Sequence, residues 1–184
     1  MTATYSCAMN VLDIRMYGDP VLREAVKDVE VIDGRLASLA EVMIETMHAA
    51  PGVGLAANQI GVSKRLFVYD AGDGPVTVIN PRIIESDGEF TYTEGCLSVP
   101  GFAWEITRPD RVLLVGLDLD GNELSLEASE FEGRIFQHEV DHLDGILLVE
   151  RLDPDQRREA RAVLRAEFSS QRRDPAGSSS PLEL

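Results

Sequence analysis

Residues 137–142 read Gln-His-Glu-Val-Asp-His, and this stretch decides how the rest of the chain is interpreted. On a helix, His138 and His142 lie one turn apart on the same face, so both imidazoles can reach one metal ion. Glu139 lies about 100° away around the helix axis, where its carboxylate can act on a metal-bound water as a general base. The alternative is a helix whose histidines only cap it or fill space.

The third ligand of such a site has to come from elsewhere in the chain, because a catalytic metal site generally uses three protein ligands. The candidates are His48 and Cys96. Cys96 lies in residues 94–100, Glu-Gly-Cys-Leu-Ser-Val-Pro, and a thiolate binds divalent metals strongly. A free cysteine is otherwise a small buried apolar residue. His48 falls near the end of a predicted helix, where it more often balances the helix dipole.

Composition narrows the class of protein. The net charge of −15 over 184 residues argues against a general or sequence-specific nucleic-acid-binding surface. No apolar run reaches the ~20 residues needed to span a membrane, and the N-terminus does not resemble a signal peptide. Two cysteines, Cys7 and Cys96, do not make the disulfide framework of a secreted protein. We therefore expect a cytoplasmic protein with no membrane partner.

Three helices are predicted from apolar periodicity and capping residues. The first covers residues 33–50. The second carries residues 137–142 and begins at Ser129, with Glu132 completing a capping box. The third begins at residues 153–154 and is rich in arginine, which favours either a solvated face or contact with an anionic partner. Its apolar stripe consists of Ala160, Val163, Leu164 and Phe168.

Short strand-like runs separated by turns predict antiparallel sheets. We therefore predict an α+β fold, in which antiparallel β-sheets pack around the central metal-binding helix, with an additional N-terminal-half helix and a C-terminal helix. Residues 11–173 are expected to form a single catalytic domain, between a loose leader, 1–10, and a disordered tail, 174–184. The strand-like runs are residues 65–70, 76–80, 83–84, 90–93, 111–119 and 123–126.

Residues 52–59 read Gly-Val-Gly-Leu-Ala-Ala-Asn-Gln, in which two glycines bracket one apolar residue. This favours backbone that another group approaches closely, or a tight turn packed on the core. Together with residues 94–98 and 137–142, this segment resembles, in order, the three signature motifs of peptide deformylase. The resemblance covers roughly residues 11 to 152 and includes residues 18–23, which are similar to the family's N-terminal segment.

The resemblance implies an activity and a metal site. The family removes the formyl group from the N-terminal formylmethionine of nascent peptides and releases formate. Its metal is typically Fe(II), and Zn, Ni or Co can occupy the site. By motif match, Cys96, His138 and His142 are the implied ligands, and Glu139 is the implied acid and base that activates the metal-bound water. The lack of a transit-like leader favours a bacterial enzyme.

The resemblance also implies the groups that stabilise the oxyanion and hold the peptide. The oxyanion donors are the Gln59 amide and the Leu97 backbone N–H. The extended peptide pairs with backbone at Val53, Gly54 and Gly95.

The methionine side chain needs an apolar slot. Phe131 and Ile135 precede His138 by seven and three residues, so they lie on the metal-facing side of the second predicted helix. Val53, from residues 52–59, is the third candidate for this slot. Arg134 also faces the site, either at its rim or paired with an acid.

Two further expectations concern the surroundings of the site. Glu94 and Arg108 are expected to pair behind the metal ligands and to steady the cysteine loop. In this family the C-terminal helix can dock on the ribosome, and the Arg-rich residues 156–173 are consistent with such a contact.

Two rival functions remain to be distinguished. A zinc peptidase with the same helix motif would cleave internal peptide bonds and would not need Cys96 as a ligand. A non-catalytic binding protein that kept the fold would be expected to have lost Glu139, Gln59 or Cys96, and all three are present.

Overall fold

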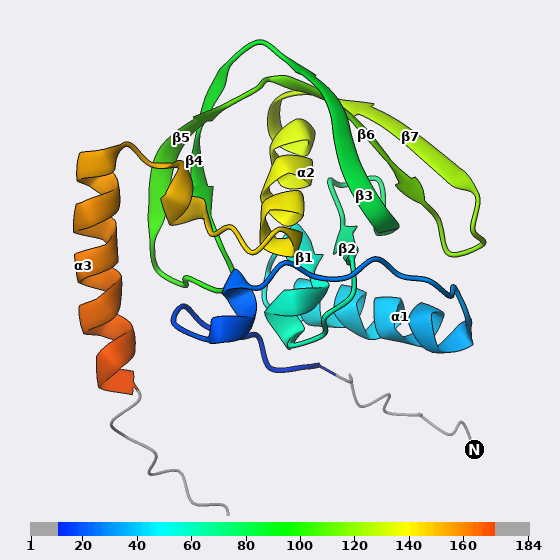
Figure 1. Ribbon diagram of the computed structural model, residues 1–184, viewed down its shortest axis with the longest axis horizontal. Helices are drawn as coiled ribbons and strands as arrows, with labels where there is room; N and C mark the ends of the chain where they lie inside the picture. Colours follow the sequence, from blue (N-terminus) through cyan, green and yellow to red (C-terminus); the bar gives the residue numbers. More distant parts are fainter. Residues whose placement is uncertain (1–10, 172–184) are drawn as a thin grey trace, which may run out of the picture.

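The computed structural model describes residues 11–171, with side chains to residue 168, and confirms the predicted α+β class (Figure 1). Helix α2 runs through the middle of the molecule, and strands curve around it. The predicted leader and tail lie outside the described residues. The helices are α1 (Gly34–Ala49), α2 (Glu130–Leu143) and α3 (Pro154–Gln171), with 3-10 turns η1 (Pro20–Arg23), η2 (Ala57–Ile60) and η3 (Leu148–Arg151).

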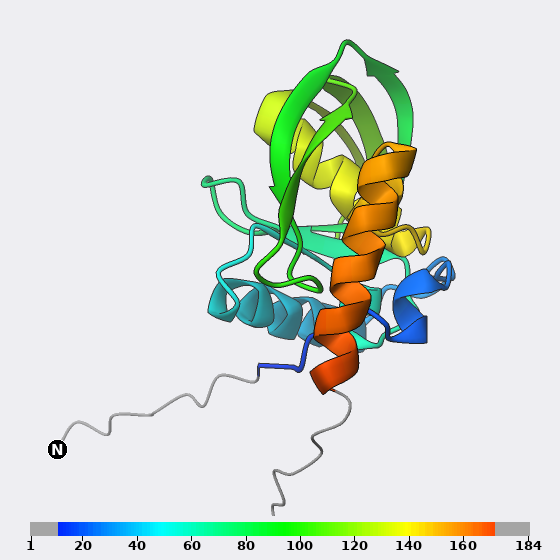
Figure 2. The same ribbon diagram turned by 90° about the vertical axis from the view of Figure 1, so that its left-hand side faces the viewer.

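Two antiparallel sheets enclose α2. One has the strand order β1-β2-β3-β6-β7, and the other is the hairpin β4-β5. Figure 2 shows this hairpin beside α3 and in front of α2. The strands are β1 (Gly54–Ala56), β2 (Leu66–Tyr69), β3 (Val76–Asp87), β4 (Phe90–Gly95), β5 (Ala103–Arg108), β6 (Arg111–Leu117) and β7 (Glu123–Ala128).

The predicted strands differ from the observed ones in three places, and the first is β1, which was not among the predicted runs. The runs 76–80 and 83–84 form one long strand, β3, which bends where its register with β6 shifts. Asn80, at this irregularity, has a φ of 52° and bonds to both backbone groups of Val29. Strand β5 was not among the predicted runs. It pairs along its whole length with β4 and so completes the wall beside α2.

Helix α1 begins and ends within one residue of its prediction. The Asp33 carboxylate accepts hydrogen bonds from the backbone N–H groups of Arg35 and Leu36, as expected of an N-cap residue. His48 lies in the last turn, where its Nε2 is 3.2 Å from the Asp70 Oδ2 at the surface. His48 is therefore paired with a carboxylate and is not in the cluster of potential metal ligands.

Helix α2 begins where predicted, but the predicted capping box is wrong. Ser129 makes no side-chain capping bond. Instead, the Glu130 N–H donates to the Asp110 Oδ1 at 3.0 Å, and Glu130 has a φ of 50°. Gly133 then allows a close approach, since a Cβ there would lie 3.0 Å from the Asp110 carbonyl oxygen. The turn between β5 and β6 thus sets the start of α2.

Helix α3 confirms the predicted stripe except at one residue. Ala160, Leu164 and Phe168 are buried against a cluster that includes Leu22, whereas Val163 is 50% exposed. Helical periodicity gave the apolar stripe, but the stripe is wider than the surface that covers it. Among the described helices, none has the length and apolar content needed to cross a membrane.

Candidate metal centre

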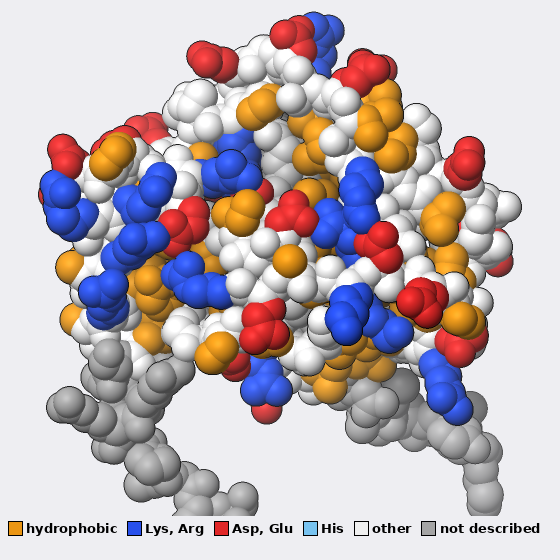
Figure 3. Space-filling model, viewed as in Figure 1, with side chains coloured by type: hydrophobic (Ala, Val, Ile, Leu, Met, Phe, Trp, Pro, Cys, Tyr) orange, Lys and Arg blue, Asp and Glu red, His pale blue; other side chains and the backbone are white. Residues whose placement is uncertain are grey.

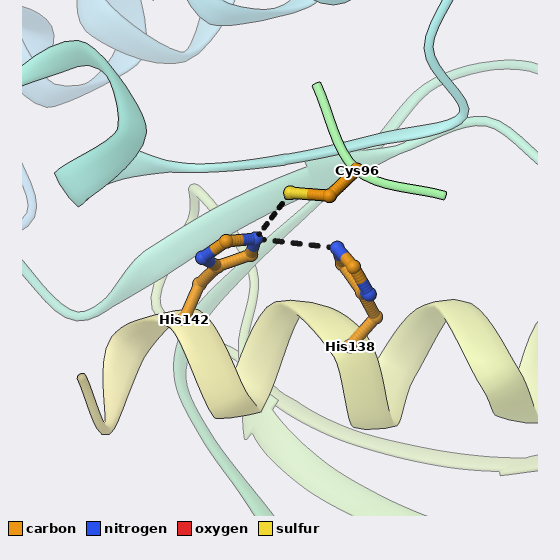
Figure 4. Close-up of side chains that lie close together, drawn as sticks. All are labelled: Cys96, His138 and His142. Carbon is orange, nitrogen blue, oxygen red and sulfur yellow. Dashed lines mark hydrogen bonds between the residues drawn. The ribbon is translucent and has the colours of Figure 1, made fainter. Parts of the chain in front are cut away.

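Three side chains that could bind a metal converge at the middle of α2 (Figure 4). His138 and His142 project from the same face of the helix, and Cys96 reaches them from the loop after β4. The His142 Nε2 lies 3.2 Å from the Cys96 Sγ and 3.2 Å from the His138 Nε2. The three potential ligand atoms lie within 4.8 Å of one another. The structure thus brings together the three predicted ligands.

The cysteine loop is folded tightly around its sulfur. The Ser98 N–H donates to the Cys96 Sγ at 3.4 Å, and the Val99 N–H donates to the Cys96 carbonyl oxygen at 2.9 Å. Cys96 is a free cysteine, and Cys7 lies outside the described residues. These bonds fix the direction in which the sulfur points.

A buried carboxylate, Glu94, holds His138 from behind. The His138 Nδ1 donates to the Glu94 Oε1 at 2.6 Å. Arg108 binds both carboxylate oxygens, at 2.7 and 3.0 Å, and Arg134 donates to Oε2 at 3.1 Å. Burial would raise the pKa of Glu94, but the bonds to His138 and Arg108 outweigh it and hold that pKa well below its usual value. The carboxylate therefore orients the imidazole so that its Nε2 faces the cluster.

These contacts confirm the predicted ion pair, and for Arg134 both alternatives hold. Glu94 and Arg108 do pair, and both are buried. Arg134 is paired with an acid through Glu94, and its Nη2 also donates to the Phe90 carbonyl oxygen. It still contributes to the cavity wall described below. The contact of Glu94 with His138 was not predicted.

Asp141, three residues after His138 on α2, extends this network. The Arg108 Nη1 donates to the Asp141 Oδ2 at 2.6 Å, and the Arg151 Nε donates to the same oxygen at 2.8 Å. Neither contact was predicted. A continuous chain of charged hydrogen bonds therefore runs from Arg151, at the surface, to His138.

Glu139 is buried beside the cluster, and its Oε2 has no hydrogen-bond partner. Burial is the main cause that raises the pKa of Glu139 to about 7, against the lowering effect of His138. The backbone of Gly54 packs directly on this carboxyl group, because a Cβ at Gly54 would lie 2.4 Å from the Glu139 Oε1. Only glycine allows this approach, which explains the second glycine of residues 52–59.

A cavity of about 380 Å³ opens next to the cluster and Glu139. Every residue predicted to hold the peptide or stabilise the oxyanion lies in its wall. These residues are Val53, Gly54, Gln59, Gly95, Leu97, Phe131 and Ile135.

Gln59 is held with its amide nitrogen toward the cysteine loop. Its Oε1 accepts the Ala56 N–H at 2.8 Å, and its Nε2 lies 3.1 Å from the Ser98 Oγ. The same Nε2 is 3.8 Å from the Cys96 Sγ. The Leu97 side chain packs over Gly52, where a Cβ would lie 2.6 Å from the Leu97 Cδ1.

The sequence interpretation missed two aromatic residues of the cavity wall, Tyr92 and Phe102. The ring of Tyr92 lies 5.7 Å from that of Phe131, centroid to centroid. Strand alternation could have found Tyr92, because it lies two residues before Glu94 and so shares its face of β4. No comparable signal marks Phe102, which lies in the loop before β5.

The family profile and the most similar proteins point to the same family. A family profile described as polypeptide deformylase matches residues 11–158. The chain is 49% identical over 164 residues to peptide deformylase 1 of Corynebacterium efficiens, covering 86% of this chain and 96% of that protein. It is 48% identical over 145 residues to a peptide deformylase of Agathobacter rectalis, covering 79% of this chain and 92% of the relative.

Solved structures agree with the sequence comparison. The peptide deformylase of Thermus thermophilus superimposes with a TM-score of 0.82 at 44% identity, over 88% of this chain and 99% of that chain. The peptide deformylase of Synechococcus elongatus, solved in complex with actinonin, gives a TM-score of 0.79 at 37% identity. That match covers 89% of this chain and 91% of the other.

Proposed function

Because the chain belongs to the polypeptide deformylase family, we propose that Cys96, His138 and His142 hold its metal ion and that Glu139 moves the protons of its reaction. The chain is an enzyme, a hydrolase that removes the formyl group from the N-terminal methionine of nascent peptides. The observation that carries the proposal is the convergence of the three ligand atoms beside a buried carboxyl oxygen without a partner.

The donor atoms suit one divalent metal ion. A thiolate and two imidazole nitrogens form a tripod, with the His138 imidazole already oriented by Glu94. We propose Fe(II) as the ion, and Zn, Ni or Co fit the same mixed ligand set. When bound, the ion would act as a Lewis acid, so that water loses a proton near neutral pH.

Glu139 carries the proton transfers in this proposal. Glu139 lines the cavity and its buried Oε2 has no hydrogen-bond partner, so this carboxylate can accept a proton from the attacking water. A pKa of about 7 allows the same carboxyl group to return that proton to the leaving amine nitrogen. The formyl carbon then leaves as formate, and the methionine amine is free.

Two donors are proposed for the oxyanion that forms when water attacks the formyl carbon. They are the Gln59 Nε2 and the Leu97 backbone N–H, both at the cavity beside Cys96. The Ala56 N–H fixes the orientation of the Gln59 amide, so its nitrogen needs no rearrangement during the reaction.

The peptide is proposed to lie extended between the Val53–Gly54 backbone and Gly95. Phe131 and Ile135 then form the apolar slot for the methionine side chain. Ile135 is buried at the base of the slot, and Phe131 is exposed at its mouth. Since a solved relative binds actinonin, we expect actinonin to compete with the peptide in this cavity.

The catalytic domain, residues 11–173, is proposed to act in the cytoplasm, where formylated nascent chains are made. Helix α3 is proposed to contact the ribosome through its basic side chains, which gather over α3 in Figure 3. Removal of α3 would expose the core that Leu164 covers, so charge reversal is the cleaner test. Arg158→Glu with Arg165→Glu should weaken ribosome binding most at low salt, and unchanged binding would contradict the contact.

Metal analysis tests the central proposal. Protein purified without oxygen should carry one Fe(II) per chain and release formate from formyl-Met-Ala-Ser. A chelator should abolish that release, and Fe(II) should restore it. Cleavage of internal peptide bonds would instead support the peptidase, and full activity without metal would contradict the proposed site.

A further inference from the structure

A second groove, mainly apolar, lies between β5 and α3. It has a volume of about 400 Å³. The residues that α3 contributes are spaced at i, i+3, i+4 and i+7, so they share one face of the helix. The groove is lined by Phe102 and Trp104 on one side and by Gln156, Glu159, Ala160 and Val163 on the other.

Phe102 joins this groove to the substrate cavity, because it lines both. Its ring stacks on that of Trp104, with centroids 5.9 Å apart and ring planes 8° apart. The two rings therefore form one aromatic surface that leads from the cavity wall into the groove. A peptide that leaves the cavity past Gly101 and Phe102 meets this surface next.

The groove face of α3 lies beside the face that anchors the helix, and Ala160 belongs to both. Leu164 and Phe168 are buried in the core. Arg157 donates to the Glu150 carbonyl oxygen, and Arg161 donates to the Glu150 carboxylate on η3. Val163 lies outside these contacts and is 50% exposed. In Figure 3, hydrophobic side chains show next to the basic side chains over α3.

We propose that this groove binds an apolar side chain of the formylated peptide, downstream of the residues that the substrate cavity holds. The inference rests on the proposed function, because the peptide has to be seated at the metal first. Aromatic and aliphatic walls suit an apolar side chain, and successive side chains of an extended peptide advance by about 3.3 Å each. Glu159, the charged residue in the lining, disfavours an acidic side chain at the same place.

A peptide series tests this subsite. The parent is formyl-Met-Ala-Ser-Ala-Ala-Ala, and a single leucine is moved through positions three to six. We expect leucine at one of positions four to six to raise kcat/KM by about tenfold, mainly through KM, which is the scale of one buried apolar side chain. Aspartate at that position should remove the gain.

The variant Val163→Asp places a charge in the groove without touching the metal site. The ratio of kcat/KM for the leucine peptide to that for the parent should fall to about one. The matched control is Ile84→Asp, which changes a similarly exposed aliphatic residue on β3 and should retain the ratio. A ratio that Val163→Asp leaves unchanged would overturn the groove assignment.

The remaining outcomes separate this inference from the proposed function. If metal-loaded enzyme hydrolyses formyl-Met-Ala-Ser but no leucine position gives a gain, the groove inference fails and the proposed function stands. If the tripeptide is not hydrolysed, both fail. If sedimentation shows a dimer that Val163→Asp dissociates, a second copy of the chain covers the groove, and the peptide assignment is wrong.

Discussion

Helices α2 and α3 differ in how much of each is buried. In α2, every residue from Gly133 to Leu143 is buried, including polar and charged ones. In α3, one apolar stripe is buried, and basic side chains such as Arg158 and Arg165 are exposed. Helix α2 combines core packing with buried polar partners, whereas α3 is held by one apolar stripe and by the bonds of Arg157 and Arg161 to Glu150.

This difference shows where the sequence constrains function. A buried polar group requires a partner of defined geometry, because an unpartnered one is strongly destabilising. Several polar side chains of α2 therefore depend on residues elsewhere in the chain. Glu94 binds Arg134 and His138, and Arg108 binds Asp141. The exposed side chains of α3 have no such requirement, so substitutions there should have smaller effects on folding.

The largest effect is expected from loss of a ligand. Cys96→Ala removes one of three donors from the α2 cluster, so metal content should fall to background, and formate release should fall with it. Both are measured on the same preparation. Cys7→Ala is the control for loss of a thiol as such. Retention of stoichiometric metal in Cys96→Ala would show that the tripod is not the metal site.

Arg108→Ala should be the most destabilising change behind the ligands. It leaves the buried carboxylates of Glu94 and Asp141 short of a partner, so the free energy of unfolding should fall by about 3–5 kcal/mol. Metal affinity should fall by roughly 10–100-fold. The control is Arg111→Ala, whose pair with Asp87 is exposed and should contribute about 1 kcal/mol at most. Equal denaturation midpoints for the two variants would contradict the network.

Gly54→Ala should separate catalysis from metal binding. The added Cβ would displace the Glu139 carboxyl, so kcat should fall about 10²-fold while metal content is unchanged. Gly34→Ala is the matched control, since a Cβ there meets nothing within 4 Å. If both variants keep full activity, Glu139 does not need its observed position.

The smallest effect is expected on the exposed flank of α3. Val163→Ser should change the free energy of unfolding by no more than about 0.5 kcal/mol. Its neighbour Leu164 is fully buried, and Leu164→Ala should lower that free energy by about 2–5 kcal/mol. Urea denaturation measures both. Equal losses in the free energy of unfolding would mean that Val163 is covered in solution.

The site was largely predictable because its chemistry depends on short motifs. Two histidines at helical spacing gave two of the three candidate ligands from geometry alone. The third ligand could be chosen between His48 and Cys96 only through the resemblance of three motifs to a family. The structure places Cys96 with the histidines and His48 at the surface with Asp70.

What could not be predicted depends on contacts between distant parts of the chain. Ser129 satisfied the capping pattern, but Asp110, from the turn between β5 and β6, supplies the bond instead. Glu94 contacts His138 only because β4 lies beside α2. Val163 fits the apolar period of α3, yet periodicity does not show where the covering surface ends.

The central claim is that Glu139 moves protons at a metal held by other residues, and one variant tests it most directly. Glu139→Ala should retain the wild-type ratio of metal to protein, while kcat/KM for formate release from formyl-Met-Ala-Ser falls by about 10²–10⁴-fold. Glu127→Ala, at an exposed carboxylate on β7, should match wild type in both measurements. Near-normal turnover by metal-loaded Glu139→Ala would contradict the account.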